Sequence, residues 1–180
     1  PHDNMEIISI PLEGDMEHAD SMGNKTVIRK GDIQAMSAGT GVVHSEYNAS
    51  ADRPVKFLQI WVFPDRKNIQ PQYSQVSLDP ADRKNRLQQI VSPRSSDNEG
   101  VTVQQNAWFN MGDLERGKQL NYDVKRKGNG VYVFVLKGEV TIEDQQLDAR
   151  DGLGIWETDR ISIAAATDAE ILLMDVPVDM

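Results

Sequence analysis

Two residues of chemical interest, His44 and Glu46, lie two positions apart near the end of the stretch GDIQAMSAGTGVVHSEYN, residues 31–48. On an extended chain, residues two apart point to the same side, so the imidazole and the carboxylate would lie together. Imidazole binds Fe, Zn, Cu and Ni, and two histidines with one carboxylate form the ligand set of non-haem Fe(II) oxygenases. The pattern therefore indicates a candidate metal site in a chain that has only three histidines.

His2 is the second imidazole that could join this pair. It begins a run in which His2, Asn4 and Glu6 alternate, and a closed barrel brings strands that are distant in sequence to a common interior. The residues alone leave two possibilities open. Either His2 and His44 meet around a metal ion, or they are surface or hydrogen-bonding residues.

Other candidate residues have plainer interpretations. We expect His18 to be an exposed residue of a hairpin, because it lies between a strand end and the turn at residues 21–24. Glu6 either orients a ligand histidine or is an ordinary polar strand residue. We expect core or domain-interface packing for the large apolar side chains Trp61, Trp108 and Trp156, and gap-filling in the first barrel for Met16, Met22 and Met36.

The elements that must position these residues are strands. Short runs rich in Val, Ile and aromatic residues, such as VKFLQIWVFP and NGVYVFVLKGEVTIED, are separated by Gly, Asn, Asp and Pro. This spacing is typical of an all-β sandwich or barrel. The polar residues 64–100 contain four prolines, and we expect them to form a linker that crosses between two domains.

A weak internal repeat supports two similar β-domains. LEGDMEH at residues 12–18 resembles LKGEVTI at residues 136–142, and RKGDIQAMS at residues 29–37 resembles ARDGLGIWET at residues 149–158. We expect an N-terminal domain over residues 1–63, the linker over 64–100 and a C-terminal domain over 101–180. At the positions that correspond to His44 and Glu46, the second copy has Ala165 and Thr167, so we expect it to lack metal ligands.

Composition narrows the function classes. The net charge of −9 and the pI of about 4.8 disfavour direct nucleic-acid binding. The chain contains no cysteine, which excludes thiol catalysis and cysteine-held metal sites. No apolar run approaches the roughly 18 residues of a membrane helix, and no signal peptide is apparent. We expect a soluble cytoplasmic protein.

The residues resemble the cupin superfamily and, within it, the pirin family. His2, Glu6 and Gly14 match the later part of the first cupin motif, and Gly31, Gly39, His44 and Asn48 match the second, with Ser37 in place of its proline. The phrase LEGDMEHADSMGN…IRKGDIQAMSAGTGVVHSE is similar to the pirin signature over about 45 residues.

The resemblance implies a bicupin, that is, two jelly-roll β-barrels in tandem with one metal ion in the first. It implies His2, His44 and Glu46 as metal ligands, and Fe(II) as the expected metal, with Cu, Ni, Mn, Co or Zn as alternatives. In pirins a further histidine belongs to a His-Pro-His motif, and it would precede Pro1. The first strands of the family's barrel are also expected upstream of Pro1.

Two functions follow from the resemblance, and a third possibility stays open beside them. The first is a metal-dependent dioxygenase of the quercetin 2,3-dioxygenase type, with a flavonol as substrate and Glu46 as the general base. The alternative is a non-enzymatic, iron-dependent redox regulator that acts through a protein partner. The third possibility is a folded scaffold that has lost its metal.

Overall fold

The computed structural model describes residues 1–94 and 99–178. The regular elements of these residues are strands, apart from one short 3-10 helix, η1 (Pro80–Arg83). No helix in the described part of the chain is long and apolar enough to span a membrane. The expected all-β class is confirmed.

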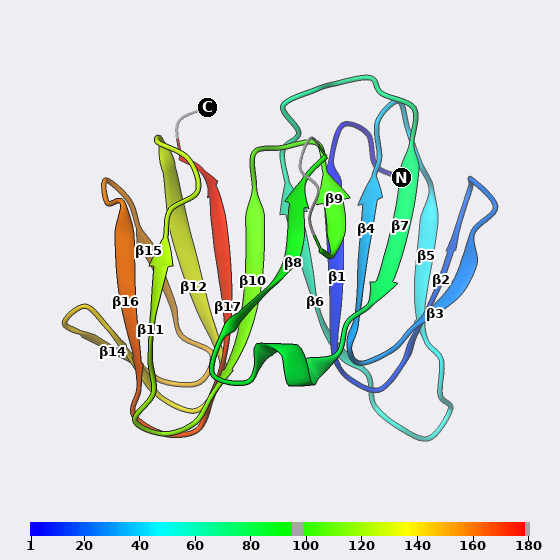
Figure 1. Cartoon of the computed structure of the whole chain (residues 1–180). Coiled ribbons are helices and arrows are strands. Elements are labelled where there is room, and N and C mark those ends of the chain that lie inside the picture. Colours follow the sequence, from blue (N-terminus) through cyan, green and yellow to red (C-terminus); the bar gives the residue numbers. More distant parts are fainter. Residues whose placement is uncertain (95–98, 179–180) are drawn as a thin grey trace. The chain divides into compact units, whose positions relative to one another are not determined.

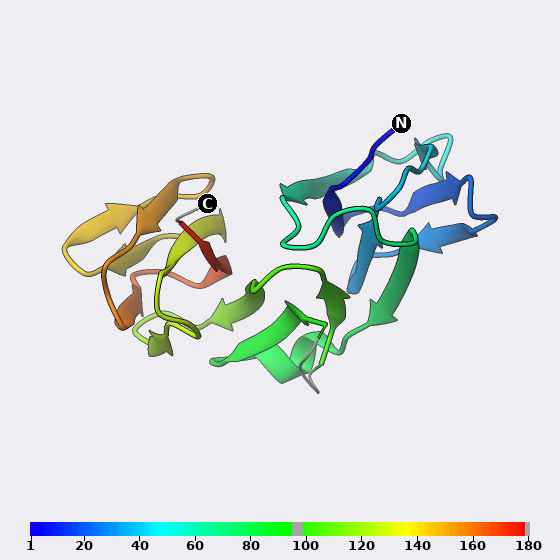
Figure 2. The same ribbon diagram turned by 90° about the horizontal axis from the view of Figure 1, so that it is seen from above.

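The chain divides into two compact units. Unit 1 contains Pro1–Leu78 and Ser92–Gln105, and unit 2 contains Asp79–Val91 and the chain from Asn106 onward. Seen from above, the strands of each unit curve around an interior of their own (Figure 2). This is the tandem arrangement of cupin-like domains that the internal repeat predicts.

Unit 1 is built from a four-stranded and a three-stranded antiparallel sheet, with orders β6-β1-β4-β7 and β3-β2-β5 (Figure 1). A further short strand, β9, contacts β4 and β7. The strands of this unit are β1 (Glu6–Glu13), β2 (Met16–Asp20), β3 (Lys25–Ile28), β4 (Asp32–Ser37), β5 (His44–Asn48), β6 (Lys56–Val62), β7 (Gln72–Ser77) and β9 (Val101–Val103).

Strand pairing in the larger sheet of unit 1 aligns polar side chains in one row. Ser9 on β1 lies opposite Gln59 on β6 and opposite Gln34 on β4, which in turn lies opposite Gln75 on β7. Directly paired residues point to the same face of a sheet. The Ser9 hydroxyl donates to Glu46 on β5, so this face is turned toward the strand that carries the candidate metal ligands.

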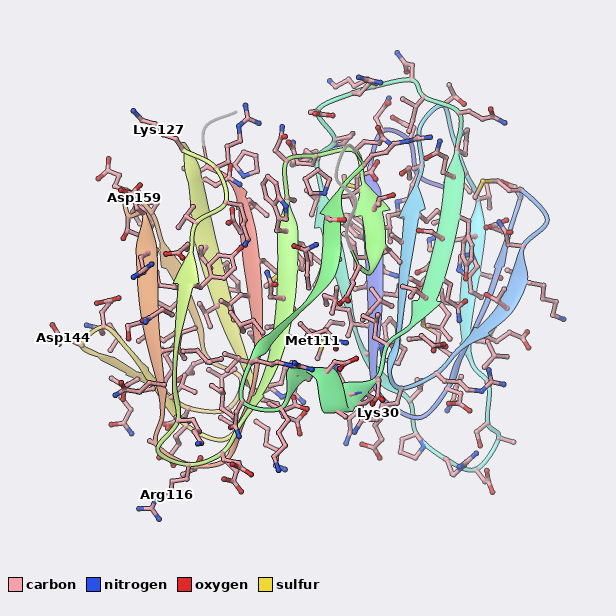
Figure 3. The ribbon with its side chains drawn as sticks, in the orientation of Figure 1. Lys30, Met111, Arg116, Lys127, Asp144 and Asp159 are labelled. Carbon is pink, nitrogen blue, oxygen red and sulfur yellow. The ribbon has the colours of Figure 1, made fainter. Side chains whose placement is uncertain are left out.

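Unit 2 has a four-stranded sheet, β11-β16-β13-β14, and the strands β15-β12-β17-β10-β8 of a larger sheet. Its interior is aliphatic, with Val133, Ile163 and Leu173 fully buried. Charged loop residues such as Arg116 and Asp144 point outward (Figure 3). The strands are β8 (Leu87–Pro93), β10 (Trp108–Leu114), β11 (Gln119–Asp123), β12 (Asn129–Lys137), β13 (Val140–Ile142), β14 (Gln145–Leu147), β15 (Gly152–Ile155), β16 (Arg160–Ala165) and β17 (Ala169–Pro177).

The segment expected as a linker has more structure than its polar composition suggested. It contributes β7 to unit 1, contains η1, and forms β8, whose residues through Val91 belong to unit 2 while Ser92 and Pro93 belong to unit 1. The division of the chain by contacts therefore differs from the expected boundaries at 63 and 101. Residues 95–98 of the expected linker lie outside the described residues.

Candidate metal centre

The glycine-rich turn before β5 determines how the strand with His44 enters unit 1. Gly39 has a positive φ of 49°, and a side chain there would collide with the carbonyl oxygen of Ile69. The same oxygen accepts a hydrogen bond from the backbone N–H of Thr40 at 2.9 Å. Only glycine combines this φ with such a close approach.

β5 pairs with β2, and the register places four chemically active side chains on one face. His18 on β2 lies directly opposite Glu46, and Asp20 lies opposite His44. His18 is 0% exposed, so the expectation of an exposed hairpin residue is wrong. The signal for its burial was the alternation of Met16 and His18 along β2, because Met16 is also fully buried and shares the same face.

Asp20 fixes the orientation of the His18 ring. The Nε2 atom of His18 lies 3.1 Å from Oδ2 of Asp20, while Oδ1 of Asp20 accepts from the backbone N–H groups of Met22 and Asn24. Burial raises the pKa of Asp20, but hydrogen bonds from Asn24 and His18 outweigh it and hold the pKa below its ordinary value. A charged Asp20 favours the hydrogen on Nε2 and leaves Nδ1 of His18 with a free lone pair.

His44 and Glu46 form the centre of the group. Nδ1 of His44 lies 3.9 Å from Oε1 of Glu46, which is too long for a hydrogen bond. Burial lowers the pKa of His44 more than the carboxylate of Glu46 raises it. The imidazole of His44 is therefore neutral at pH 7, the form in which histidine binds a metal ion.

His2 reaches the same place from the chain start. Its backbone pairs with Val42, two residues before His44, through hydrogen bonds of 2.8 and 2.9 Å. The rings of His2 and His44 are 5.0 Å apart at their centroids, and those of His18 and His44 are 5.5 Å apart. The rings of His2 and His18 thus both lie beside that of His44.

The two oxygens of Glu46 have different partners. Oε1 accepts from the hydroxyl of Ser9 at 3.3 Å, and Oε2 accepts from Nε2 of Gln59 at 2.5 Å. The second contact was not foreseen from the sequence. Gln59 is on β6, and only the pairing of β6 with β1 brings it beside Ser9.

The donor set fits a metal ion. One ligand atom each from His18, His44 and Glu46 lies within 4.8 Å of the other two. Because metal–nitrogen and metal–oxygen bonds are about 2.0–2.2 Å long, donors up to about 4.4 Å apart can share an ion, so a small closing movement suffices. Moreover, the Nδ1 atoms of His18 and His44 are buried without a hydrogen-bond partner. Such orphaned lone pairs cost free energy unless an ion or a proton donor satisfies them.

Glu6 belongs to a different environment. It lies three positions before Ser9 on β1 and so points to the opposite face of the sheet. Its Oε2 accepts from the hydroxyl of Ser37 at 2.7 Å and from the backbone N–H of Gln104 at 3.1 Å. Burial raises the pKa of Glu6, although these two hydrogen bonds lower it in part. Of the two roles expected for Glu6, the structure supports that of a polar strand residue.

Sequence comparison places this geometry in a family. The family model described as Pirin matches residues 1–62, and the model described as Quercetinase C-terminal cupin domain matches residues 89–176. Quercetin 2,3-dioxygenase of Escherichia coli strain K12 is 40% identical over 177 residues, which cover 98% of this chain and 74% of that protein. The chain belongs to the pirin family. A pirin-like protein of Caulobacter vibrioides is 33% identical over 175 residues, 97% of this chain and 75% of its own length.

Solved pirin structures agree with the fold. The crystal structure of YhhW from Escherichia coli superposes with a TM-score of 0.91 at 38% identity, over 99% of this chain and 75% of that one. Bacterial pirin YhhW in complex with nickel(II), also from Escherichia coli, gives a TM-score of 0.89 at 38% identity, over 98% and 74% of the two chains. The expected bicupin fold is thereby confirmed.

Proposed function

We propose that this pirin is a metal-dependent dioxygenase of the quercetin 2,3-dioxygenase type, with a flavonol as substrate. The observation that carries the proposal is the half-buried pair of His44 and Glu46, whose facing Nδ1 and Oε1 atoms lie 3.9 Å apart without a hydrogen bond. The identity to Escherichia coli quercetin 2,3-dioxygenase supports the choice of reaction.

We propose His2, His44 and Glu46 as the residues that hold one divalent ion. The proximity of the His2 ring to His44 supports this set. His18 is a second candidate for the other imidazole, because it and not His2 lies in the compact group of ligand atoms. Single His2→Ala and His18→Ala variants decide between them. Loss of the histidine that binds the metal should weaken metal binding at least tenfold more than loss of the other histidine.

The chain's own groups supply the acid–base chemistry. A bound ion would act as a Lewis acid and lower the pKa of a substrate hydroxyl. Glu46 would accept the proton of the flavonol 3-hydroxyl as general base. Ser9 and Gln59 donate to its two oxygens and so keep the carboxylate in one orientation. Because burial lowers the pKa of His44, Glu46 and not His44 would accept this proton.

Metal reconstitution tests the proposal. The protein is loaded anaerobically with Fe(II), Cu(II), Ni(II), Mn(II) or Co(II), and quercetin is followed in air at its visible absorption band. We expect metal-dependent decay that a Glu46→Gln variant loses while it still binds quercetin. Stoichiometric metal without any turnover in all five forms would contradict the proposal.

Iron as the preferred metal and the cytoplasmic location remain predictions. The alternative function, a redox regulator that acts through a protein partner, also remains a prediction. It is tested by pull-down with and without metal under oxidising and reducing conditions. Equal recovery of partners in all four conditions would count against a switch.

A further inference from the structure

A large aromatic side chain stands beside the metal centre and faces solvent. Trp61 on β6 was expected to pack in a core or an interface, but it is 55% exposed. Tryptophan offers a large flat apolar surface together with one N–H donor, which suits it to binding a ligand when it is exposed. Trp61 lies two positions after Gln59 on the same strand, so both side chains share the face that is turned toward Glu46.

A chain of hydrogen bonds connects the indole to the candidate general base. Nε1 of Trp61 donates to Oε1 of Gln59 at 3.3 Å, and Nε2 of the same amide donates to Oε2 of Glu46 at 2.5 Å. The amide of Gln59 can have only one orientation if both bonds form. The orientation of the indole and that of the carboxylate are therefore linked.

The ring of His2 limits the indole on another side. The two ring centroids are 5.0 Å apart with an interplanar angle of 78°, an edge-to-face contact. With its N–H engaged by Gln59 and the His2 ring packed edge to face against it, the indole is held while more than half of the residue stays open. A held, exposed ring is a preorganised stacking surface, because little side-chain entropy is lost when a ligand binds.

We propose that Trp61 is the stacking surface for a planar aromatic ligand whose ionisable hydroxyl reaches Glu46, with Gln59 as the positioning residue between them. This inference rests on the proposed function and adds a residue that recognises the substrate's ring system. The ligand class is a flat, hydroxylated aromatic molecule. The indole of Trp61 would bind the ring of the ligand and Glu46 would accept its proton, so recognition and chemistry depend on strands of different sheets, β6 and β5.

Unit 2 offers a matched control. Trp156 is exposed to a similar degree, 62%, and lines a cavity of about 610 Å³ together with Arg126, Lys127 and Asp159. Among the described residues, Trp156 has no side-chain hydrogen bond that could link it to a carboxylate, as Gln59 links Trp61 to Glu46. If exposure and a nearby cavity were sufficient for aromatic binding, Trp156 would be the better site. If the hydrogen-bonded link to Glu46 is required, Trp61 is the better site.

The test compares Trp61→Leu, Trp61→Phe and Trp156→Leu in the full chain. Binding of quercetin to the Ni(II)-loaded protein is measured anaerobically by calorimetry, and turnover is measured separately in air. Aromatic stacking predicts about a 5- to 10-fold higher Kd for Trp61→Leu, at most a threefold change for Trp61→Phe, and no change for Trp156→Leu. Each variant is saturated with Ni(II) before the comparison, and the melting temperature of Trp61→Leu should match the wild type, because an exposed side chain contributes little to packing.

The outcomes separate the inference from the proposed function. An unchanged Kd in Trp61→Leu, or a loss confined to Trp156→Leu, would overturn the inference and leave the proposed function standing. Wild-type protein that binds quercetin through Trp61 but never consumes it in air would overturn the proposed function alone. A wild-type protein that does not bind quercetin would overturn both.

Discussion

The two units share an architecture but differ in what fills their interiors. In unit 1, the row across the larger sheet reads Gln59, Ser9, Gln34 and Gln75. In unit 2, a corresponding four-strand row reads Leu153, Val133, Leu173 and Asn110. Buried polar groups cost free energy unless they are paired, and both amide atoms of Gln34 are buried without a partner. Both units leave some buried polar atoms unpaired, including Nδ2 of Asn110 in unit 2. The row of unit 1 is nevertheless polar along its whole length, whereas the row of unit 2 is mainly aliphatic.

One carboxylate from each unit shows a further difference, in hydrogen bonding. Asp175 in unit 2 is 0% exposed and accepts from the hydroxyl of Tyr122, the backbone N–H of Lys125 and the amide of Asn129. Three donors make it a closed structural group. Glu46 in unit 1 accepts from Ser9 and Gln59, but it also faces Nδ1 of His44 across 3.9 Å, and that nitrogen has no hydrogen-bond partner. At the candidate metal centre, the Nδ1 atoms of His18 and His44 are buried without a hydrogen-bond partner, whereas each oxygen of Asp175 has at least one donor.

The largest effect that tests this difference between the two units is expected from removal of His44. His44→Ala deletes the imidazole nearest Glu46, so we expect bound metal to fall from about one ion per chain to a trace, measured by plasma mass spectrometry. The control is Thr167→Ala, at the position of unit 2 that corresponds to Glu46. It should keep its metal. Stoichiometric metal in His44→Ala would refute the ligand assignment.

Removal of Asp175 should have the reverse pattern. Asp175→Ala leaves the donors on Tyr122, Lys125 and Asn129 unsatisfied in the core of unit 2, so we expect the free energy of unfolding to fall by about 3 kcal/mol or more. Urea unfolding measures the loss, and metal content of the folded protein should stay at the wild-type level. A loss below about 1 kcal/mol would mean that this carboxylate is not the structural group inferred here.

Gln59→Leu tests the support of Glu46 with a smaller effect. The loss of the amide that donates to Oε2 should weaken metal affinity by about tenfold, within the range typical of groups that orient ligands. The absorption spectrum of the Co(II)-loaded protein should also shift, which a general loss of stability would not cause. Lys56→Met, on the same strand but paired with Glu13, is the control. An identical Co(II) spectrum in Gln59→Leu would rule out a positioning role.

Glu6 provides the smallest effect, through pH. Its raised pKa means that the folded protein binds the proton more tightly than the unfolded chain. The stability of the wild type relative to Glu6→Gln should therefore fall as pH rises from the ordinary value of 4.5 through the higher folded pKa, and then level off. Urea unfolding between pH 4 and pH 7 measures this difference. A difference that grows in favour of the wild type with rising pH would contradict the burial of this carboxyl.

Much of the fold could be predicted from local pattern. Alternating apolar runs and glycine turns predicted the strands, and the repeat predicted two β-units. The pairing of His44 with Glu46 followed from a spacing of two on a strand. The pattern did not separate inward from outward faces reliably: His18 is buried and Trp61 is exposed, the reverse of expectation. Polar composition also concealed β7 and β8 within the expected linker.

By itself the sequence determined which side chains share a strand face, because that depends only on the two-residue repeat of an extended chain. Tertiary structure decided which faces meet. His18 opposes Glu46, 28 residues further along the chain, because β2 pairs with β5. Gln59 reaches Glu46 from β6, a strand of the other sheet of unit 1, whose place is fixed by its pairing with β1. Such pairings depend on the register of distant strands and on which face the closed sheets turn inward, and no local pattern encodes either.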